Sequence, residues 1–165
     1  MTLYMETLYE RLASRHFISE NQTALREHLS LKEHHATYVL LLKTKKECCS
    51  FQVDGYLIPD NDTEKFDKVV LVKAASNRWG EIFVELKGTK IAHAIQQLKA
   101  TLSNPLFKGT VCSFKKARVV MGNRIPANTG NSIIERAKVD FRKSGCEFRT
   151  LKSNQPDIIR DTDFN

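Results

Sequence analysis

The chain of 165 residues carries 26 Lys and Arg against 19 Asp and Glu, a formal net charge of +7 at pH 7. Hydrophobic residues make up 41% and charged residues 27%, as in a soluble globular protein of one domain. The longest apolar run, residues 38–42, is too short to span a membrane, and the N-terminal segment lacks the apolar core of a secretory signal. We therefore expect a cytoplasmic protein.

The N-terminal part of the chain predicts two helices. Residues 3–13 carry apolar side chains at a period of four, which is typical of a helix with one buried face. A second helix is predicted over residues 19–34, because Ser19 and Gln22 have the spacing of a capping box that satisfies two backbone amides reciprocally. Further apolar side chains at helical spacing follow these two residues.

Four strands are predicted next, because short apolar and partly β-branched runs replace the helical period. They cover residues 37–43, 49–59, 66–74 and 81–87, and Pro59 ends the second of them. The third and fourth strands flank the loop sequence SNRWG. We expect these two strands to form a hairpin.

The C-terminal half of the chain predicts alternating helices and strands. A helix capped by Thr89 runs to Leu102 and has an apolar stripe along one face. A strand over residues 110–121, a helix over residues 132–143 and a strand over residues 146–152 follow. A run of strands followed by alternating helix and strand implies a mixed sheet with helices packed on it.

These elements predict an α/β (α+β) fold with a mixed central β-sheet flanked by helices. The whole chain, residues 1–165, is expected to form a single domain. Its parts are an N-terminal helical segment (1–18), a core (19–121), a C-terminal helix and strand (122–152) and a polar tail (153–165) that we expect to be loosely ordered.

The predicted hairpin brings charged side chains together. If Ala74 pairs with Gly80, Asp67 lies opposite Lys87, and opposite residues in a sheet point to the same face. Glu85 lies two residues before Lys87 and points to that face as well. The three side chains then converge at one end of the sheet, whereas a register slip of one residue would send Asp67 to the other face.

Two carboxylates beside a lysine suit metal-assisted phosphate chemistry. Hard oxygen ligands bind Mg²⁺ or Mn²⁺, and a bound ion can hold a phosphate oxygen and lower the pKa of its water. The lysine can orient that water or stabilise developing charge. The alternative is structural: Glu85 and Lys87 form a surface ion pair on an edge strand, and Asp67 caps the start of its strand.

These residues resemble the PD-(D/E)xK nuclease superfamily, which includes restriction endonucleases and archaeal Holliday junction resolvases. The resemblance rests on Asp67, the motif Glu85-Leu86-Lys87 on the next strand and Gln96-Gln97 on the following helix. The stretches VDGYLIP, KFDKVVLV, IFVELKG and HAIQQL look particularly like small bacterial and phage members. The position before Asp67, usually proline in that superfamily, is Phe66 here.

The resemblance implies a restriction endonuclease-like αβββαβ core with an extra C-terminal helix and strand. By that resemblance Asp67 and Glu85 are metal ligands, Lys87 is the catalytic lysine, and Gln97 supports the site. Many members add a glutamate from the first core helix, and the sequence does not decide among the candidates. These are Glu20, Glu27 and Glu33, and Asp54 is a further candidate, either as a ligand or as a turn former.

The spread of positive charge favours a polyanionic partner. Basic clusters occur in the sequences KTKK, FKKAR and ERAKVDFRK. For each cluster the alternative is a solvated face, and for Trp79 the alternative to stacking on a base is packing at a hairpin tip. The candidate nucleic-acid contacts are Lys115, Lys116, Arg118, Arg124 and Trp79.

The sequence therefore leads to three hypotheses. The first is an Mg²⁺- or Mn²⁺-dependent nuclease that hydrolyses phosphodiester bonds in DNA, in phage–host defence or in repair. The second is a catalytically inactive nucleic-acid-binding or regulatory module on the same fold, and the third is an RNA-directed toxin nuclease. The expected partners are nucleic acid, with DNA favoured over RNA, and a second copy of the chain or a partner protein of a defence system, but no membrane.

Overall fold

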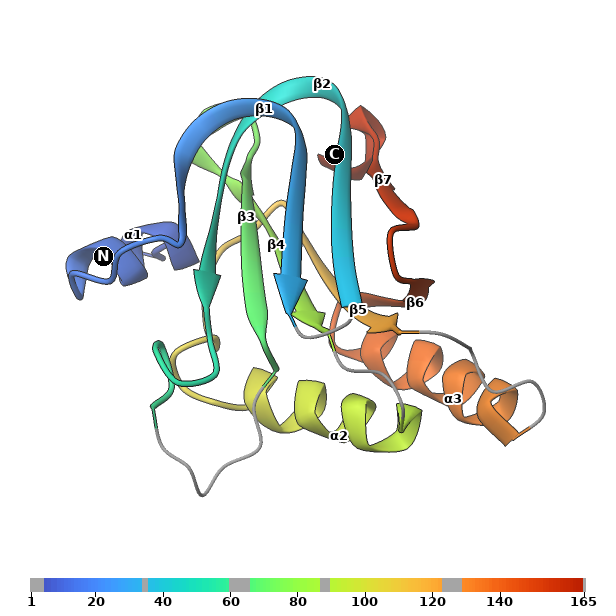
Figure 1. The fold of residues 1–165 in the computed structure, drawn as a ribbon. Helices are drawn as coiled ribbons and strands as arrows, with labels where there is room; N and C mark the ends of the chain where they lie inside the picture. The colour runs from blue at the N-terminus through green and yellow to red at the C-terminus, as the bar shows by residue number, and fades with distance from the viewer. Residues whose placement is uncertain (1–4, 34–35, 60–65, 87–89, 123–128, 165) are drawn as a thin grey trace.

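A computed structural model describes residues 5–33, 36–59, 66–86, 90–122 and 129–164. Within them a mixed sheet of seven strands is flanked by three helices, which confirms the predicted fold class (Figure 1). The elements are α1 (Leu8–Ser14), β1 (Asn21–Glu33), β2 (Ala36–Gln52), β3 (Lys68–Lys73), β4 (Trp79–Glu85), α2 (Ile91–Leu102), β5 (Phe114–Met121), α3 (Thr129–Lys143), β6 (Cys146–Lys152) and β7 (Pro156–Ile159).

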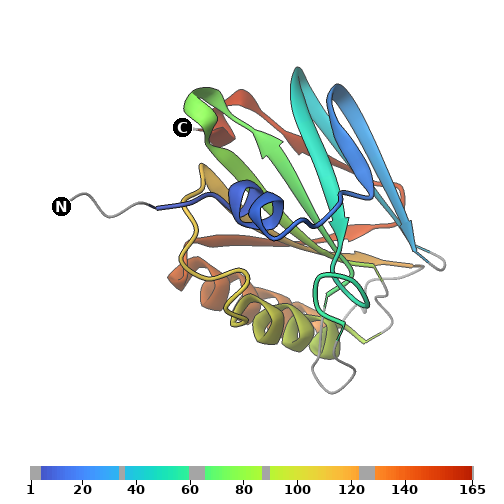
Figure 2. The same ribbon diagram turned by 90° about the vertical axis from the view of Figure 1, so that its left-hand side faces the viewer.

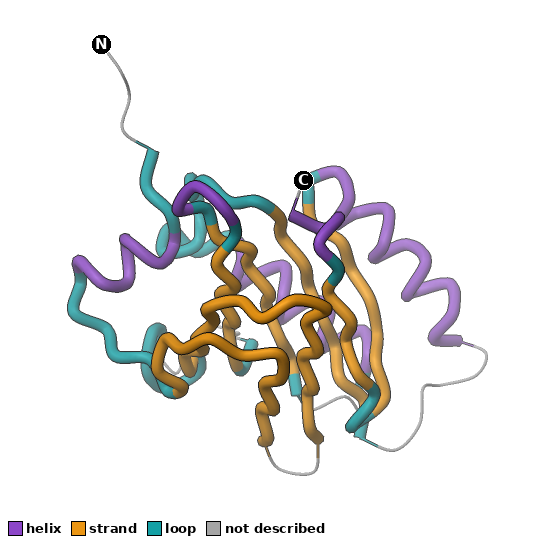
Figure 3. Tube along the Cα trace, turned by 90° about the horizontal axis from the view of Figure 1, so that it is seen from above, coloured by secondary structure: helices purple, strands orange, loops and turns teal. Residues whose placement is uncertain are grey.

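The strands follow one another across the sheet in the order β1-β2-β3-β4-β5-β6. Neighbours from β1 to β4 are antiparallel, whereas β5 and β6 run parallel to β4. Parallel neighbours need a long crossover, and α2 and α3 lie in the two crossover connections. Both helices lie side by side on one face of the sheet, and Figure 2 shows them beneath it. Seen from above in Figure 3, α3 runs alongside the outer strands.

The hairpin of β1 and β2 folds back over the other face. The C-terminal part of β2 pairs with β3, from Cys48 to Gln52, and its N-terminal part pairs with β7, from Val39 to Leu42. Register shifts in β1 after Asn21 and after Arg26 let the hairpin bend, as bulges do. Because of this bend, one continuous strand takes part in two separate layers (Figures 1 and 2).

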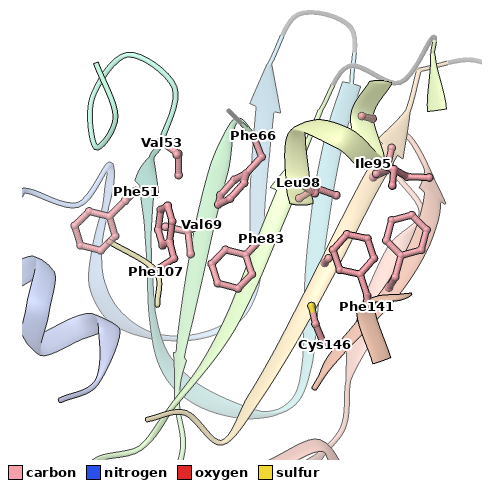
Figure 4. Packing of buried hydrophobic residues seen from close by; sticks show 14 of the residues in the cluster. Phe51, Val53, Phe66, Val69, Phe83, Ile95, Leu98, Phe107, Phe141 and Cys146 are labelled. Carbon is pink, nitrogen blue, oxygen red and sulfur yellow. The ribbon is translucent and has the colours of Figure 1, made fainter. Parts of the chain in front are cut away.

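Each face of the sheet has its own hydrophobic cluster. On the helix side, Phe66, Phe83 and Phe107 pack with ring centroids 5.3–5.7 Å apart, and Leu98 of α2 covers them (Figure 4). The cluster on the other side lies under the folded-back hairpin and consists mainly of aliphatic side chains. Strands β3 and β4 are therefore buried on both faces, which explains their almost continuous apolar sequences.

Lys68 holds the base of the folded-back hairpin. Its side chain is 4% exposed, and its ammonium group contacts Glu20, just before β1, and Glu33, the last residue of β1, at 3.5 Å. The two ends of a 13-residue strand reach the same lysine only because the strand arches. The ion pairs thus fix the arch across its base.

A buried ion pair fixes the other end of the second layer. Arg118 of β5 and Asp157 of β7 are each 1% exposed, and Arg118 Nε lies 2.9 Å from Asp157 Oδ2. Tyr38 of β2 donates a hydrogen bond to the same oxygen at 2.6 Å. Arg118 also donates to the backbone oxygen and to the carboxylate of Glu147 in β6. Strands β5, β6 and β7 therefore meet at one guanidinium group, and β2 joins them through the bond from Tyr38 to Asp157.

The predicted helix over residues 19–34 is wrong, because this segment forms β1. Only Leu29 and Leu31 of the strand are buried, and they alternate as a strand with one covered face requires. Pairing with the long strand β2 outweighs the local helical pattern. The capping box lies earlier, where Thr7 and Glu10 cap α1 reciprocally.

Several other predicted elements differ from the structure in their bounds. The predicted strand 37–43 and the first part of the predicted strand 49–59 belong to the single bent strand β2, which ends at Gln52 and not at Pro59, because residues 53–58 form a turn. The predicted strand 110–121 begins only at Phe114. The tail, which was expected to be loosely ordered, forms β7 and the short 3-10 helix η2 (Asp161–Phe164). No helix among the described residues is long and apolar enough to cross a membrane.

Breaking the Arg118–Asp157 pair is expected to destabilise the protein strongly. Asp157→Ala removes the buried counter-charge of the guanidinium and leaves it only the partly exposed carboxylate of Glu147, which costs about 3–5 kcal/mol of the free energy of unfolding. The matched control is Glu47→Ala, which removes an exposed ion pair with Lys73 and should leave the unfolding curve nearly unchanged. Urea denaturation of the three proteins measures the effect. Equal and small effects of both substitutions would contradict an anchoring role for Asp157.

Candidate functional site

The hairpin of β3 and β4 has a register two residues away from the predicted one. Val72 pairs with Gly80, and the turn is closed by a hydrogen bond of 2.7 Å from the backbone N of Ala74 to the oxygen of Arg78. The predicted pairing of Ala74 with Gly80 is therefore wrong. A shift of two residues keeps every side chain on its face, but it brings Asp67 beside Glu85. Lys87 lies outside the described residues.

Backbone and side-chain hydrogen bonds hold Asp67 between two strands. Its backbone N donates to Val84 O at 3.1 Å, and its backbone oxygen accepts from Val53 N at 2.9 Å. Its carboxylate oxygen Oδ2 accepts from the backbone N of Leu86 at 2.8 Å. Asp67 is 4% exposed, so this carboxylate is a fixed group inside the protein.

Glu85 is the last residue of β4 and is completely buried. Side chains alternate along the strand, so Glu85 lies on the helix side of the sheet with Phe83 and Glu81. A carboxylate that leaves water needs a compensating charge or hydrogen bonds. Asp67 and Glu85 together bring two acidic groups to the end of neighbouring strands, where a hard divalent cation could be bound by oxygen atoms.

Helix α2 is connected to the same end of the sheet. Thr101 Oγ1 accepts a hydrogen bond from the backbone N of Phe66 at 3.1 Å and donates to the oxygen of Gln97 at 2.6 Å. Gln97 is half-buried, whereas Gln96 is exposed. The turn of the helix that carries Gln97 is therefore fixed next to the residue that precedes Asp67.

Asp54 lies at the same end of the sheet as Asp67, whereas the three candidate glutamates lie elsewhere. Asp54 follows Val53, which is hydrogen-bonded to Asp67, and lies in a turn at Gly55 with a φ of 83°. Glu20 and Glu33 bind Lys68, whose side chain points to the opposite face of β3 from Val69. Glu27 is exposed on β1 at a register shift. Among the described residues, no group of three or more His, Cys, Asp or Glu side chains is arranged to hold a metal ion.

The predicted nucleic-acid contacts are for the most part internal. Lys116 is 4% exposed and bonded to Glu147 and Asp163, and Arg118 is the buried guanidinium described above. Trp79 is 5% exposed and stacks on Tyr9 at 4.3 Å, so the packing alternative describes it. Lys115 is half-buried and lines a groove, and Arg124 lies outside the described residues. Among the described residues of this set, Lys115 and Lys116 line that groove, and Lys116 is already paired with Glu147 and Asp163.

A scan against protein-family models and searches of curated proteins and of solved structures found no match to this chain. The site is therefore interpreted from its own residues.

Glu81 is a further buried carboxylate on the same face of β4 as Glu85, and it was not among the residues predicted from the sequence. Its Oε2 accepts a hydrogen bond from Thr110 at 2.8 Å, and its Oε1 has no hydrogen-bond partner in the described part of the chain. Burial raises the pKa of Glu81 to about 7, although the charge of Lys115 and the bond from Thr110 oppose this. The signal was its position two residues before Phe83 in an apolar strand, which predicts that it faces the interior.

Glu81 is expected to make stability fall as pH rises. The unfolded chain ionises this group near pH 4.5, whereas the folded protein keeps it protonated up to about pH 7. The free energy of unfolding is therefore highest below pH 4.5 and falls by about 3 kcal/mol between pH 4.5 and 7. Glu81→Gln does not ionise, so its stability relative to wild type should grow across this range and then level off. Urea unfolding of both proteins at several pH values measures this, and a constant difference would refute it.

Proposed function

We propose that the protein is a metal-dependent nuclease that hydrolyses phosphodiester bonds in DNA, in phage–host defence or in repair. The observation that supports this most is the placement of Asp67 and Glu85, two buried carboxylates at the ends of neighbouring strands. We place the protein in the cytoplasm, where nucleic acid and millimolar Mg²⁺ are both present. The resemblance to PD-(D/E)xK nucleases adds Lys87, two residues after Glu85.

The chemistry of the two carboxylates fits a divalent ion. Each carboxylate has several acceptor positions, so the bond from Leu86 to Asp67 leaves further lone pairs for a cation. Asp67 and Glu85 would hold Mg²⁺ or Mn²⁺, and such an ion supplies positive charge at a phosphate oxygen and acidifies its water. Burial strengthens the attraction between the ion and both carboxylates, because the local dielectric constant is low.

The residues of the chain fix this site before any ligand arrives. The bond from Leu86 N sets the orientation of the Asp67 carboxylate, and the bond between Phe66 and Thr101 fixes α2 against β3. Sites on strands and helices hold their geometry better than sites on loops. Gln97, on this fixed helix, would support the site as the resemblance implies.

A second candidate function is a catalytically inactive module that binds nucleic acid. The observation that favours it is the hydrogen bond from Leu86 to Asp67, which gives this carboxylate a structural role at the end of β4. An RNA-directed nuclease would use the same carboxylates and differ only in its substrate. Substrate choice and metal dependence together separate these functions.

Cleavage assays test the proposal. Supercoiled plasmid, single-stranded DNA and RNA are each incubated with the protein in the presence of Mn²⁺ or EDTA. We expect plasmid cleavage with Mn²⁺ only, and a loss of at least about 100-fold in rate for Glu85→Gln, since it removes a charge that holds the ion. Glu81→Gln is the matched control, because it removes a buried carboxylate from the same face of the same strand. It should cleave like wild type.

Other outcomes choose between the candidates. Cleavage of RNA alone would support the RNA-directed nuclease. No cleavage of any substrate, together with binding of the plasmid, would support the inactive module. Equal cleavage rates for Glu85→Gln and Glu81→Gln would show that Glu85 takes no part in the reaction.

A further inference from the structure

A groove runs along the outer edge of the sheet, and neither Asp67 nor Glu85 lines it. It encloses about 770 Å³ and is lined by the stretch 145–150, by α3 and by the start of β5. Within the described chain β6 pairs only with β5, so its outward backbone groups have no partner strand. An open strand edge of this kind is a template for pairing with another extended chain.

The groove is strongly basic. Lys138 and Arg142, one helical turn apart on α3, lie on one wall, and Arg149 and Lys115 lie on the strands. Two of these basic residues form exposed ion pairs, Lys138 with Glu135 at 3.0 Å and Arg149 with Glu147 at 3.6 Å, and an acidic ligand can replace such pairs. The acidic residues of the groove are engaged as well. Glu147 accepts from Arg118 at 2.7 Å and from Lys116 at 3.2 Å, and Asp163 accepts from Lys116 at 2.9 Å. The net charge that a ligand meets is therefore positive.

The aromatic residues of the groove do not favour nucleic acid. Single strands bind by stacking bases on exposed rings. Phe148 is 2% exposed and stacked on Phe141 at 5.1 Å, and Phe114 packs edge-on against Phe164 at 5.0 Å. No described ring of the groove presents a free face to a base.

A second copy of the chain is disfavoured by charge. Two β6 edges paired about a two-fold axis would place the two α3 helices on the same side of the joined sheet. Lys138 and Arg142 would then meet the same residues of the other copy, and like charges repel. An acidic chain would instead be attracted by Lys138 and Arg142.

We infer that β6 is a docking edge for an extended acidic peptide segment of a partner protein, which adds to the sheet as a further strand. The backbone of the segment pairs with the free edge of β6, and acidic side chains at alternate positions reach Lys138 and Arg142. This inference does not depend on the proposed nuclease function, because neither Asp67 nor Glu85 lines the groove.

The test uses a fluorescein-labelled peptide of alternating Glu and Thr and a second peptide with the same side chains but N-methyl groups on alternate backbone nitrogens. Fluorescence anisotropy measures binding to the full chain. The first peptide should bind, and N-methylation should weaken binding at least about tenfold because it blocks strand pairing without changing charge. Hydrogen exchange of the amides in β6 should slow when the first peptide is bound.

Variants locate the peptide. Arg142→Ala and Lys138→Ala should weaken binding several-fold, whereas Lys45→Ala, an exposed lysine outside the groove, should not. Asp67→Asn should bind the peptide like wild type, which keeps this test separate from the nuclease proposal. Equal binding of the N-methylated peptide, no binding at millimolar concentration, or displacement by a ten-residue oligothymidylate at lower concentration would each overturn the inference.

Discussion

The buried ion pair between Arg118 and Asp157 is the interaction on which the second layer of the fold depends. A guanidinium and a carboxylate that leave water are stable only together, so the pair forms only when β7 reaches β2 above β5. Tyr38 completes the group, and its own pKa is raised well above its ordinary value by burial and by the charge of Asp157. The pair therefore ties the folded-back part of β2, through β7, to the sheet below it.

This arrangement constrains every polar group in the interior. The central strands are covered on both faces, so each charged side chain that they bury must have a partner. Lys68, Lys116 and Arg118 meet this requirement with acidic neighbours on the hairpin side. On the helix side Asp67 accepts a hydrogen bond from Leu86 and Glu81 accepts one from Thr110, and Asp67 and Glu85 at the strand ends are the pair for which we propose a metal ion.

The central part of the fold could be predicted from the sequence because its patterns are strong and local. The apolar runs of β3 and β4, the stripe of α2 and the alternation of β6 all gave the correct element. The hairpin then brought Asp67 and Glu85 together despite a register error of two residues, since an even shift preserves the faces. The error arose because the turn closes between Ala74 and Arg78, which the loop sequence does not reveal.

The remaining elements depend on partners far away in the chain. Leu25 and Leu29 have helical spacing, yet Leu25 is 63% exposed and the segment is a strand because β2 lies beside it. Asp157 belongs to a polar tail by sequence, and only pairing of β7 with β2 buries it. Lys116 and Arg118 have the pattern of a basic surface cluster, but the fold-back of the hairpin puts them inside. Contacts between residues so far apart in the chain produce no periodic pattern in a single sequence.

The most direct test of the proposed metal site is the number of Mn²⁺ ions bound per chain, measured by electron paramagnetic resonance of the free ion. Wild type and Glu81→Gln should each bind about one tightly held ion, because Asp67 and Glu85 remain in both. Asp67→Asn and Glu85→Gln should lose this ion. Asn at position 67 still has an oxygen to accept the bond from Leu86, so that variant should unfold cooperatively like wild type. Equal Mn²⁺ binding by all four proteins, or none by wild type, would contradict a metal site at these two carboxylates.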